Sequence, residues 1–564
     1  MKSERVGVPN LKNEGTLISD NKAKADLLNQ QFQSVFTTEP LEDPLPDMGP
    51  SPHTPMMDIK IDTTGINKLL DNLNPHKACG PDHVHACVLK ELSTTLSPFL
   101  QAIFQKSLDT GCVPEAWKEA NIAPVYKKGN RLDPANYRPI SLTCICSKIM
   151  EHIIASSMMT HFDSNNILYD LQHGFRNSRS CESKLLSLTD DLAHNREKGI
   201  QTDLIIMDFA KAFDKVPHLR LIHKLQFFGI TGKTLVWIQN FLQGRSQTVV
   251  LDGECSDSVP VTSGVPQGTV LGPILFLAYI NDLPQHAAHA KVRLFADDCI
   301  LQMSVKEKAD CEKLQSDINE ICSWEKKWLM AFNPSKCEVM SVPASRIPII
   351  FPYTLHDHPL AKVSCTKYLG LHISSNLTWG KHVEATTSKA NRTLGMLRRC
   401  LRISSTAAKE RAYMALVRPV LEYGCCVWDP HTREQVRSVE MVQRRAARYV
   451  SNDYRRTSSV TAMLRNLGWQ TLELRRKIAR QVTLYKIIHG TVYVPHTTMI
   501  APVARCSRRT NHSQTLQAIA CRNNYYRLSF FPRTIKEWNE LEPGVAEAGS
   551  LSQFKTELGK TLLH

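Results

Sequence analysis

Residues 293–301 read RLFADDCIL and place two adjacent carboxylates, Asp297 and Asp298, between two apolar runs. Each run is short enough for a β-strand, so the stretch predicts an antiparallel hairpin that turns through Ala296, Asp297 and Asp298. Aspartate is a common turn former, and for this stretch alone a hydrogen-bonded turn without any chemistry is the simpler interpretation. A third acidic residue elsewhere in the chain favours a functional interpretation.

That third carboxylate stands at the end of another apolar run, TDLIIMDF (202–209), which predicts a buried strand ending at Asp208. A carboxylate at a buried strand end is costly unless a cation compensates it. If this strand lies beside the hairpin, Asp208 meets Asp297 and Asp298, and the three like charges repel one another unless a divalent metal neutralises them. The sequence therefore predicts a metal site made of these three aspartates.

Carboxylate oxygens suit Mg²⁺, which keeps part of its water and shares substrate phosphates. Two such ions, roughly 3.5 to 4 Å apart, can clamp the attacking and leaving oxygens of a phosphoryl transfer. One ion would then lower the pKa of a primer 3′-hydroxyl while the other holds a triphosphate as pyrophosphate leaves, which is the chemistry of a polymerase. We expect two Mg²⁺ ions as cofactors, with Mn²⁺ as a substitute.

The length of 564 residues and the hydrophobic content of 42% indicate a globular protein of several packed domains. The longest apolar run, VLGPILFLAYI (270–280), is shorter than the roughly 20 residues of a membrane-spanning helix, and the first residues lack an apolar signal core. We expect an intracellular protein without a membrane partner, whose 17 cysteines are reduced. Their spacing never reads CxxC, which disfavours a structural zinc site.

The formal net charge of +15 is concentrated in the last third of the chain. Residues 381–564 hold 31 Lys and Arg against 13 Asp and Glu, and the remainder is close to neutral. A basic region attached to a near-neutral body suits a polyanionic partner, because neutralised phosphates release counterions. A solvated helical surface is the alternative, and charge alone does not separate the two.

The apolar periodicity changes twice along the chain. A Pro-rich linker or loop (37–58) precedes amphipathic helical patterns over 63–73 and 85–108. Short apolar runs between turn signals then predict strands that alternate with helices, and the Arg-rich remainder has helical periodicity. The expected strands lie in 120–130, 136–142, 202–209, 247–253 and 292–304, and the expected helices of the second half in 219–230, 307–328, 390–402, 409–421, 436–450 and 472–490.

Several stretches together resemble the reverse transcriptases of non-LTR retrotransposons of the Jockey and CR1 types. The palm motifs of that family are matched, in order, by MDFAKAFDKV (207–216), SGVPQGTVLGPILFLAYINDL (263–283), LFADDCIL (294–301), FNPSKCEVM (332–340) and KYLGLHI (367–373). Its finger motifs are similar to GCVPEAWKEANIAPVYKKGN (111–130), NYRPISL (136–142) and QHGFRNSRSC (172–181), and its thumb to LTWGKHV (377–383) and RPVLEYGCCVWDP (418–430).

The resemblance implies roles for individual residues. Asp208, Asp297 and Asp298 match the catalytic, metal-binding aspartates. Phe213 matches the position whose ring excludes a ribose 2′-hydroxyl and so favours deoxynucleotides; without the flanking motif it would be interpreted as a core aromatic. Asp214 is expected to cap the local backbone or form a salt bridge rather than bind metal.

The loop GVPQG (264–268) has glycines that let its backbone approach a ligand and opens a helix whose N-terminus favours anions. In the family this loop lies against the incoming nucleotide and the template. Lys336 matches a lysine near the triphosphate, with a solvated surface lysine as the alternative. The expected nucleotide-binding residues are therefore Phe213, Gln267, Gly268, Lys336, Lys127, Lys128 and Arg138.

Nucleic-acid contacts are expected from arginines on both sides of the metal site. Arg176 is expected to contact the template. A thumb must hold the primer–template duplex through its backbone, and clustered arginines can do this without reading sequence. The expected thumb contacts are Arg398, Arg399, Arg444, Arg445 and Arg448, whereas Trp428, Trp469 and Trp538 are interpreted as core residues.

The implied fold is α+β, a right-hand polymerase with fingers, an antiparallel palm sheet that carries the FADD hairpin, a helical thumb and a mostly helical C-terminal region. The expected boundaries are 1–107 for an N-terminal extension that is flexible and then helical, 108–377 for the reverse transcriptase domain, 378–455 for the basic thumb and 456–564 for a basic helical region. Complete elements of this family usually carry an N-terminal endonuclease, and some carry CCHC zinc knuckles; neither is recognisable in this sequence. KACGPDHVH (77–85) also departs from the family pattern, at a loop without catalytic groups.

The function implied is an RNA-directed DNA polymerase that extends a DNA primer or target on an RNA template with deoxynucleoside triphosphates. We expect the protein in the cytoplasm after its translation and in the nucleus at the site of reverse transcription. A catalytically inactive, element-derived RNA-binding protein that uses the basic C-terminal third is the main alternative. A viral-type RNA-dependent RNA polymerase is a third possibility, which Phe213 disfavours.

Overall fold

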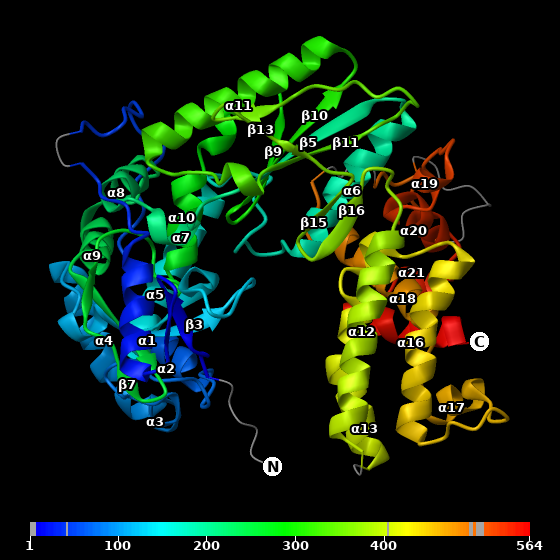
Figure 1. Cartoon of the computed structure of the whole chain (residues 1–564), viewed down its shortest axis with the longest axis horizontal. Helices are drawn as coiled ribbons and strands as arrows, with labels where there is room; N and C mark the ends of the chain where they lie inside the picture. The colour runs from blue at the N-terminus through cyan, green and yellow to red at the C-terminus, as the bar shows by residue number, and fades with distance from the viewer. Residues whose placement is uncertain (1–6, 41–42, 403–404, 496–499, 504–511, 564) are drawn as a thin grey trace.

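A computed structural model describes residues 7–40, 43–402, 405–495, 500–503 and 512–563. The architecture is mixed α+β, with two five-stranded sheets and helices around and beyond them (Figure 1). Figure 1 shows one group of helices to the left of the central sheet and a second group to its right.

The central sheet carries the predicted hairpin. Its strand order is β14-β11-β5-β10-β9, and all neighbours are antiparallel except β11 and β14. The prediction of a strand that ends at Asp208 beside the RLFADDCIL hairpin is confirmed, because β10 pairs with both β5 and β9. The strands are β5 (Gln201–Asp208), β9 (Lys291–Phe295), β10 (Asp298–Val305), β11 (Glu338–Val342) and β14 (Ala361–Lys362).

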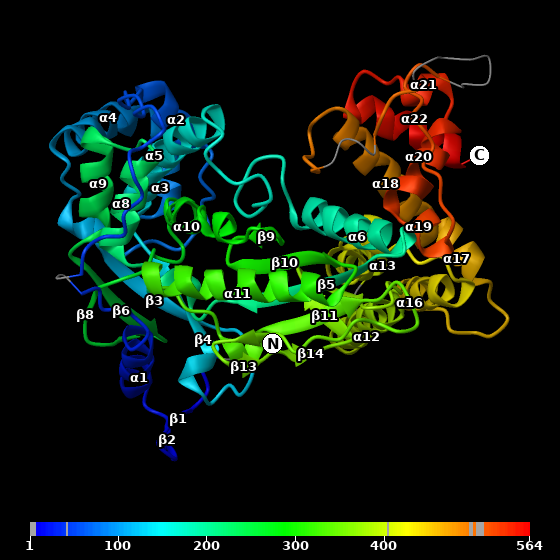
Figure 2. The same ribbon diagram turned by 90° about the horizontal axis from the view of Figure 1, so that it is seen from above.

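Both faces of this sheet are covered, so its strands are apolar on both sides. Ile205 and Leu301 belong to the same hydrophobic core as the inner face of α11 (Lys308–Trp328), whereas Leu204 and Ile300 pack with the leucines of α6 (Cys181–Glu197). Figure 2, seen from above, shows α11 lying along the sheet. Two covered faces explain why TDLIIMDF reads as a continuous apolar run rather than an alternating one.

The second sheet lies on the other side of the predicted site. Its order is β4-β3-β6-β7, with β8 also paired to β6, and β3 and β6 are parallel. Helix α1 (Asn21–Gln33) packs on β6 through Ala25, Leu28 and Phe32. The strands are β3 (Glu119–Tyr126), β4 (Tyr137–Leu142), β6 (Arg245–Leu251), β7 (Glu254–Cys255) and β8 (Val259–Val261).

Helices on the left of Figure 1 share one hydrophobic core with the α11 face of the central sheet. The predicted helix over 85–108 is broken at Leu92 into two helices, and the second ends at Gly111, whose φ of +67° suits a glycine. These helices are α2 (Thr63–Asp71), α3 (Ala86–Glu91), α4 (Ser93–Thr110), α5 (Ile145–Ser164), α7 (Ala212–Lys215), α8 (His218–Phe227), α9 (Gly232–Leu242) and α10 (Gly272–Ile280).

The Arg-rich part of the chain is helical, as predicted. Helices α12 and α16 pack against each other and extend away from the central sheet (Figure 1). Trp428 and Trp538 are fully buried and Trp469 is 9% exposed, so all three are core residues. The principal helices are α12 (Gly380–Cys400), α13 (Thr406–Leu416), α14 (Arg418–Glu422), α15 (Cys425–Trp428), α16 (Arg433–Ser451), α17 (Val460–Asn466), α18 (Leu472–Ile488), α19 (Asn524–Arg527), α20 (Phe530–Asn539) and α22 (Leu551–Leu563).

A buried ionic cluster joins these C-terminal helices. Asp429, 7% exposed, follows α15 and is paired with Arg476 (2.6 Å) and Arg480 of α18 and with Arg533 (3.1 Å) of α20. Arg480 also pairs with Glu537 at 2.7 Å. Removing a single partner from such a cluster leaves a buried charge uncompensated, so these contacts tie α15, α18 and α20 together.

None of the helices in the described ranges combines the length and the apolar character needed to cross a membrane. The cysteines in the same ranges are free thiols, as expected.

Candidate active site

Three carboxylates gather at one end of the central sheet. Asp208 is the last residue of β5 and Asp298 the first of β10, and the register places them opposite each other. Asp297 occupies the turn between β9 and β10 together with Ala296, whose φ is +51°. A left-handed conformation costs a non-glycine residue about 1–2 kcal/mol, so the surrounding structure must hold this turn in place.

The electrostatics of this group favour a bound cation. Burial, then repulsion by Asp297 and Asp208, raises the pKa of Asp298 to about 6. Burial and, to a smaller extent, the charge of Asp208 also raise the pKa of Asp297. Three oxygen-donor side chains that repel one another are a donor set suited to Mg²⁺ or Mn²⁺, because a divalent ion removes the repulsion.

Asp208 already has a cationic partner. Lys336, in the short turn after α11, lies with its Nζ 3.0 Å from Asp208 Oδ2. Sequence reasoning placed Lys336 near a triphosphate, and the structure places it at the edge of the aspartate group. Both side chains are more than a third exposed, so this is a weak pair that a stronger ligand can replace.

Most of the expected nucleotide-binding residues line one cavity, of about 440 Å³, beside these aspartates. Asp208 and Asp297 form part of its wall, and the other wall comes from β4 and the turn that connects β3 to β4. The expected residues found there are Lys127, Lys128, Arg138, Phe213, Gln267 and Lys336.

Phe213 stands between the aspartates and the core. Its ring stacks on Phe276 of α10, with 4.5 Å between ring centroids, and its carbonyl accepts the amide of Val265 at 2.8 Å. The side chain is half-buried and still lines the cavity. One face of the ring therefore packs on the core, as the core interpretation expects, and the side chain also borders the cavity that Asp208 lines.

The GVPQG loop is fixed by contacts on both sides. Gln267 donates from Nε2 to Asp214 Oδ1 at 2.8 Å, and its carbonyl accepts the amide of Ser141 at 2.7 Å. Gly268 has a φ of +115°, and a Cβ there would lie 2.6 Å from the carbonyl oxygen of Ser141, so only glycine fits. Gly268 itself lies next to the cavity wall rather than in it.

Asp214 is a positioning group rather than a ligand in this structure. It is 8% exposed, burial raises its pKa, and it accepts the hydrogen bond from Gln267. The expected capping contact or salt bridge is not found among the described residues.

The basic residues on the other wall compensate the carboxylates across the cavity. Burial and, next, the positive charge of Arg138 lower the pKa of Lys127, which indicates closely spaced cations. One wall of the cavity thus carries cations and the other carries carboxylates. Such a cavity suits a polyphosphate that pairs with the cations and shares metal ions with the carboxylates.

The predicted nucleic-acid contacts lie apart from the cavity. Arg176 donates to the carbonyls of Tyr169 (3.1 Å) and Leu168 (3.4 Å) and pairs with Asp163, which leaves its side chain only 11% exposed. The arginines of α12 and α16 are more accessible. Arg398 and Arg399 are exposed at the end of α12, and Arg444, Arg445 and Arg448 line a groove of about 720 Å³ along α16.

Sequence reasoning missed several groups of the site. Lys211, Asn333 and Tyr137 line the cavity, although each stands within a motif quoted above. Glu151 of α5 is fully buried and accepts the amides of Val270 (2.7 Å) and Leu271 (3.2 Å), so it caps the start of α10 from a distance. A contact across more than a hundred residues leaves no local sequence signal.

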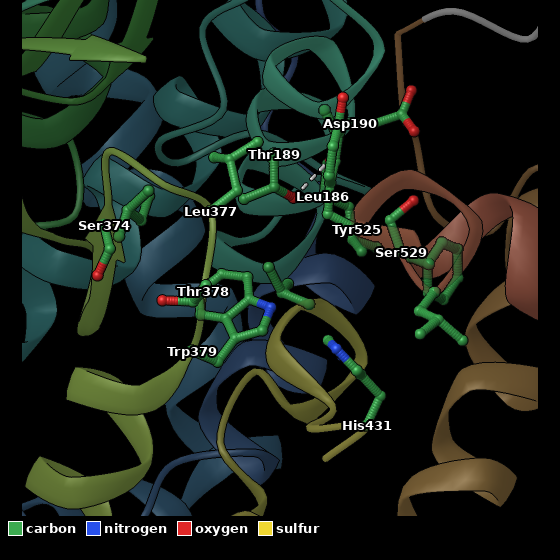
Figure 3. A pocket seen from close by; sticks show the side chains of 15 residues that line it. Leu186, Thr189, Asp190, Ser374, Leu377, Thr378, Trp379, His431, Tyr525 and Ser529 are labelled. Atoms are coloured by element: carbon green, nitrogen blue, oxygen red, sulfur yellow. Dashed lines mark hydrogen bonds between the residues drawn. The ribbon is translucent and has the colours of Figure 1, made fainter. Parts of the chain in front are cut away.

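A second cavity, of about 40 Å³, lies between α6, the segment before α12 and the C-terminal helices (Figure 3). Its wall is mostly apolar, with Asp190 at one side. Burial, followed by the charge of Asp191, raises the pKa of Asp190 to about 7. The cavity holds no part of the aspartate group, and its size suits a few water molecules.

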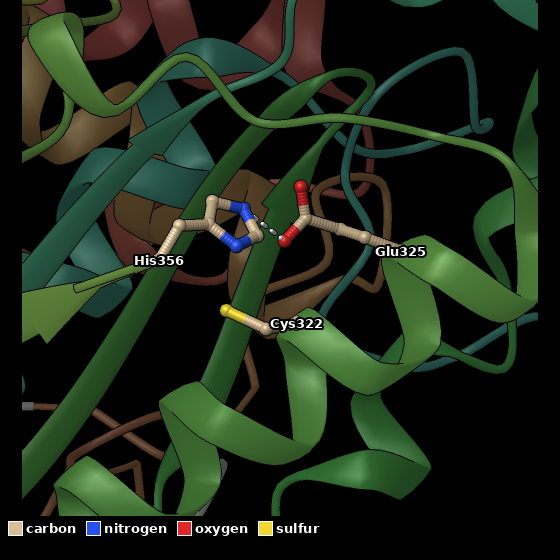
Figure 4. A group of neighbouring side chains, drawn as sticks. All are labelled: Cys322, Glu325 and His356. Carbon is tan, nitrogen blue, oxygen red and sulfur yellow. Dashed lines mark ion pairs between the residues drawn. The ribbon is translucent and has the colours of Figure 1, made fainter. Parts of the chain in front are cut away.

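A further group of possible metal ligands consists of Cys322, Glu325 and His356 (Figure 4). Within the described ranges, it is the only group of three or more His, Cys, Asp or Glu residues whose ligand atoms all lie within 4.8 Å of one another. His356 Nε2 lies 3.0 Å from Glu325 Oε2, and Glu325 Oε1 accepts the amide of Phe332 at 2.5 Å. Burial, then the nearby Glu325, raises the pKa of the Cys322 thiol to about 11. These contacts connect α11 to the β12–β13 turn (Thr354–Leu355 and His358–Pro359) and to the segment that leads to Lys336.

Residues 125–373 match the family model described as reverse transcriptase (RNA-dependent DNA polymerase). The chain is 28% identical, over 503 residues, to the probable RNA-directed DNA polymerase from transposon BS of Drosophila melanogaster, covering 84% of this chain and 54% of that protein. It is 27% identical over 440 residues to the RNA-directed DNA polymerase from mobile element jockey of the same species, covering 74% and 47%. The probable polymerase from transposon X-element is 26% identical over 392 residues, covering 67% and 42%. The chain thus spans about half the length of the curated relatives it matches.

Proposed function

Since this chain contains a reverse transcriptase domain and is homologous to the RNA-directed DNA polymerases of non-LTR retrotransposons, we propose that it extends a DNA primer on an RNA template during element replication. The observation that supports this most directly is the pairing of Asp298 with Asp208 beside Asp297, at a cavity whose other wall is cationic.

The sheets suggest a right-hand arrangement. The central sheet would be the palm and the second sheet with its neighbouring helices the fingers, so that helix α1 (Asn21–Gln33) would join the expected domain over 108–377. Helices α12 to α16 would be the thumb, over 378–455, followed by a helical region over 456–564. The matched residues 125–373 fall within the proposed polymerase domain.

Asp208, Asp297 and Asp298 would hold two Mg²⁺ ions, with Mn²⁺ as a substitute. When bound, these ions supply activation of the primer 3′-hydroxyl and neutralise charge on the triphosphate. Lys336 would exchange Asp208 for a phosphate oxygen as the nucleotide enters. Lys127, Lys128 and Arg138 would hold the triphosphate from the opposite wall, where fixed cations stabilise the charge that develops on pyrophosphate.

Selection of the sugar would fall to Phe213. Its ring stacks on Phe276, and its backbone carbonyl accepts the amide of Val265. The ring therefore cannot move away from the cavity without losing this packing contact. A 2′-hydroxyl pointing at such a wall has no room and no partner, which disfavours ribonucleotides.

The exposed arginines of α12 and α16 would hold the duplex through its phosphates, a role that needs charge and accessibility but no base contacts. Arg176, whose guanidinium is occupied by two carbonyls and Asp163, would contribute to nucleic-acid binding through the shape of its loop rather than by direct contact.

Primer extension tests the proposal. The full chain is incubated with a primed RNA template, deoxynucleotides and Mg²⁺, beside Asp297→Asn with Asp298→Asn and beside Asp252→Asn, an exposed aspartate in the β6–β7 turn. We expect extension by the unmutated protein and the Asp252 variant and none by the double variant. RNA binding without extension by the unmutated protein would instead support the inactive RNA-binding alternative.

A further inference from the structure

Residues 171–174 lie along the outer edge of the central sheet, next to the hairpin that carries Asp297 and Asp298. The amide of Leu294 donates to the carbonyl of Leu171 at 3.1 Å, and the amide of His173 donates to the carbonyl of Leu294 at 3.0 Å. Gln172 and Leu294 form a parallel bridge, so this segment extends the sheet beyond β9. The carbonyl of Leu171 also accepts Nζ of the fully buried Lys184, at 2.7 Å, which anchors the segment to α6.

The side chain of Gln172 reaches from this segment to the turn. It is 2% exposed, and its Oε1 accepts two backbone amides, that of Gly174 at 2.8 Å and that of Ala296 at 2.9 Å. Ala296 is the left-handed residue of the turn and directly precedes Asp297. One oxygen atom therefore joins the turn to the anchored segment.

Gly174 makes this close approach possible. A Cβ at this position would lie 2.4 Å from the amide nitrogen of Ala296 and 3.0 Å from its Cα, which no side chain can occupy. The backbone of the segment and the backbone of the turn are thus in direct contact, with Gln172 as the hydrogen-bond acceptor between them.

We propose that Gln172 is a positioning residue for phosphoryl transfer, because its Oε1 holds the amide of Ala296 and thereby fixes Asp297 and Asp298 where the metal ions bind. The proposal rests on the function proposed above. Outer contacts that orient metal-binding side chains matter because a small displacement of the ligands is enough to slow the reaction.

Packing alone is the competing explanation, since any buried side chain of this size would fill the same space. The two explanations differ in what the acceptor oxygen does. Loss of the oxygen at constant volume leaves packing intact but frees the turn and leaves two buried amides without a partner.

Three variants separate these explanations. Gln172→Met keeps the length of the side chain and removes the acceptor, whereas Gln172→Glu keeps an acceptor in the same place. Gln481→Met is the matched control, because Gln481 is also fully buried but lies in α18, away from the cavity. Each protein is measured for thermal unfolding, duplex affinity, kcat and KM for deoxynucleotides, and Mn²⁺ binding by electron paramagnetic resonance without nucleic acid.

We expect Gln172→Met to lower kcat and Mn²⁺ affinity by roughly 10- to 100-fold, the usual effect of losing an outer contact of a metal site. KM, duplex affinity and thermal stability should stay near those of the Gln481 control, and Gln172→Glu should recover part of the loss. Unchanged kcat and Mn²⁺ affinity in Gln172→Met, or an equal loss in Gln172→Glu, would overturn the proposal. If the unmutated chain binds Mn²⁺ but extends no primer, the proposed function fails while the Mn²⁺ comparison still decides the role of Gln172.

Discussion

Asp298 is the direct cross-strand partner of Asp208, with the two Cα atoms opposite each other in the register of β10 on β5. Like charges in this position destabilise a sheet, and here the third carboxylate, Asp297, adds to the repulsion. The end of the sheet is therefore less stable without a cation than its hydrogen bonding suggests, and this has measurable consequences.

Replacing Asp298 by Asn should stabilise the metal-free protein near neutral pH. The pKa of Asp298 is raised to about 6 in the folded state from an ordinary 3.8, so the stability that its protonated form contributes is present below pH 4 and lost as the pH rises through 6. At pH 7.5 we expect Asp298→Asn to raise the free energy of unfolding by about 1–2 kcal/mol, less than the full shift implies because solvent screens part of the charge.

Urea unfolding at pH 5 and pH 7.5, with and without Mg²⁺, measures this effect. The advantage of Asp298→Asn should grow with pH and shrink when Mg²⁺ is added, since only the unmutated site binds the ion well. An unmutated protein that is the more stable at pH 7.5 without divalent ions would contradict the electrostatic account.

Reducing the ring of Phe213 should relax sugar selection. Phe213→Val removes the part of the wall that faces the cavity, so the ratio of kcat/KM for ribonucleotides to that for deoxynucleotides should rise at least about tenfold. Phe213→Tyr keeps the wall and serves as the control. An unchanged ratio in Phe213→Val, with extension retained, would show that another group excludes the 2′-hydroxyl.

Alanine substitutions at two glycines with similar backbone conformations distinguish the cost of backbone strain from the cost of a steric collision. Gly268 (φ +115°) and Gly253 (φ +95°) are both left-handed, but a Cβ at Gly253 meets no atom within 4 Å. Gly253→Ala should cost about 1–2 kcal/mol of stability through strain alone and leave nucleotide KM unchanged. Gly268→Ala adds the collision with Ser141, which displaces Gln267, so we expect a larger loss of stability and a higher KM in steady-state extension. Equal effects of the two substitutions would mean that the GVPQG loop is not held by this contact.

The exposed arginines of α12 and α16 should act through charge only. Arg398→Gln, Arg399→Gln and Arg445→Gln should each reduce the slope of log affinity against log salt concentration by about one or less, regardless of template sequence. Filter binding at several salt concentrations measures the slope, and Lys306→Gln, exposed before α11, is the control. A slope that changes equally in the Lys306 control would place the duplex elsewhere.

Much of the fold could be predicted from local sequence. The strands that end at Asp208 and begin at Asp298 were expected from their apolar runs, and most Arg-rich helices from their periodicity. Helix α1 was not expected, because its buried face has only three apolar residues, Ala25, Leu28 and Phe32, beside the buried polar residues Lys24 and Asn29. The helix over 85–108 was expected to be continuous, and no single residue signals the break at Leu92.

The candidate site was predictable as a set of residues but not as a set of contacts. The motifs indicated the aspartates, Phe213 and Gln267; Asp208, Asp297, Phe213 and Gln267 line one cavity, and Asp298 lies beside it as the cross-strand partner of Asp208. The pairing of Lys336 with Asp208 and the hydrogen bonds of Glu151 and Gln172 join residues far apart in the chain. Such contacts follow from how the elements pack, which the spacing of residues within one motif does not encode.

The ionic cluster at Asp429 joins residues that a ribosome releases at widely separated times. Asp429 precedes α16, yet its partners Arg476, Arg480 and Arg533 come from α18 and α20, the last of them about a hundred residues later. A ribosome releases Asp429 long before α20, so the buried carboxylate of Asp429 lacks its partner Arg533 until that late segment has emerged. Folding around Asp429 is therefore complete only after α20 is available, although α16 can pack on α12 and α13 before then.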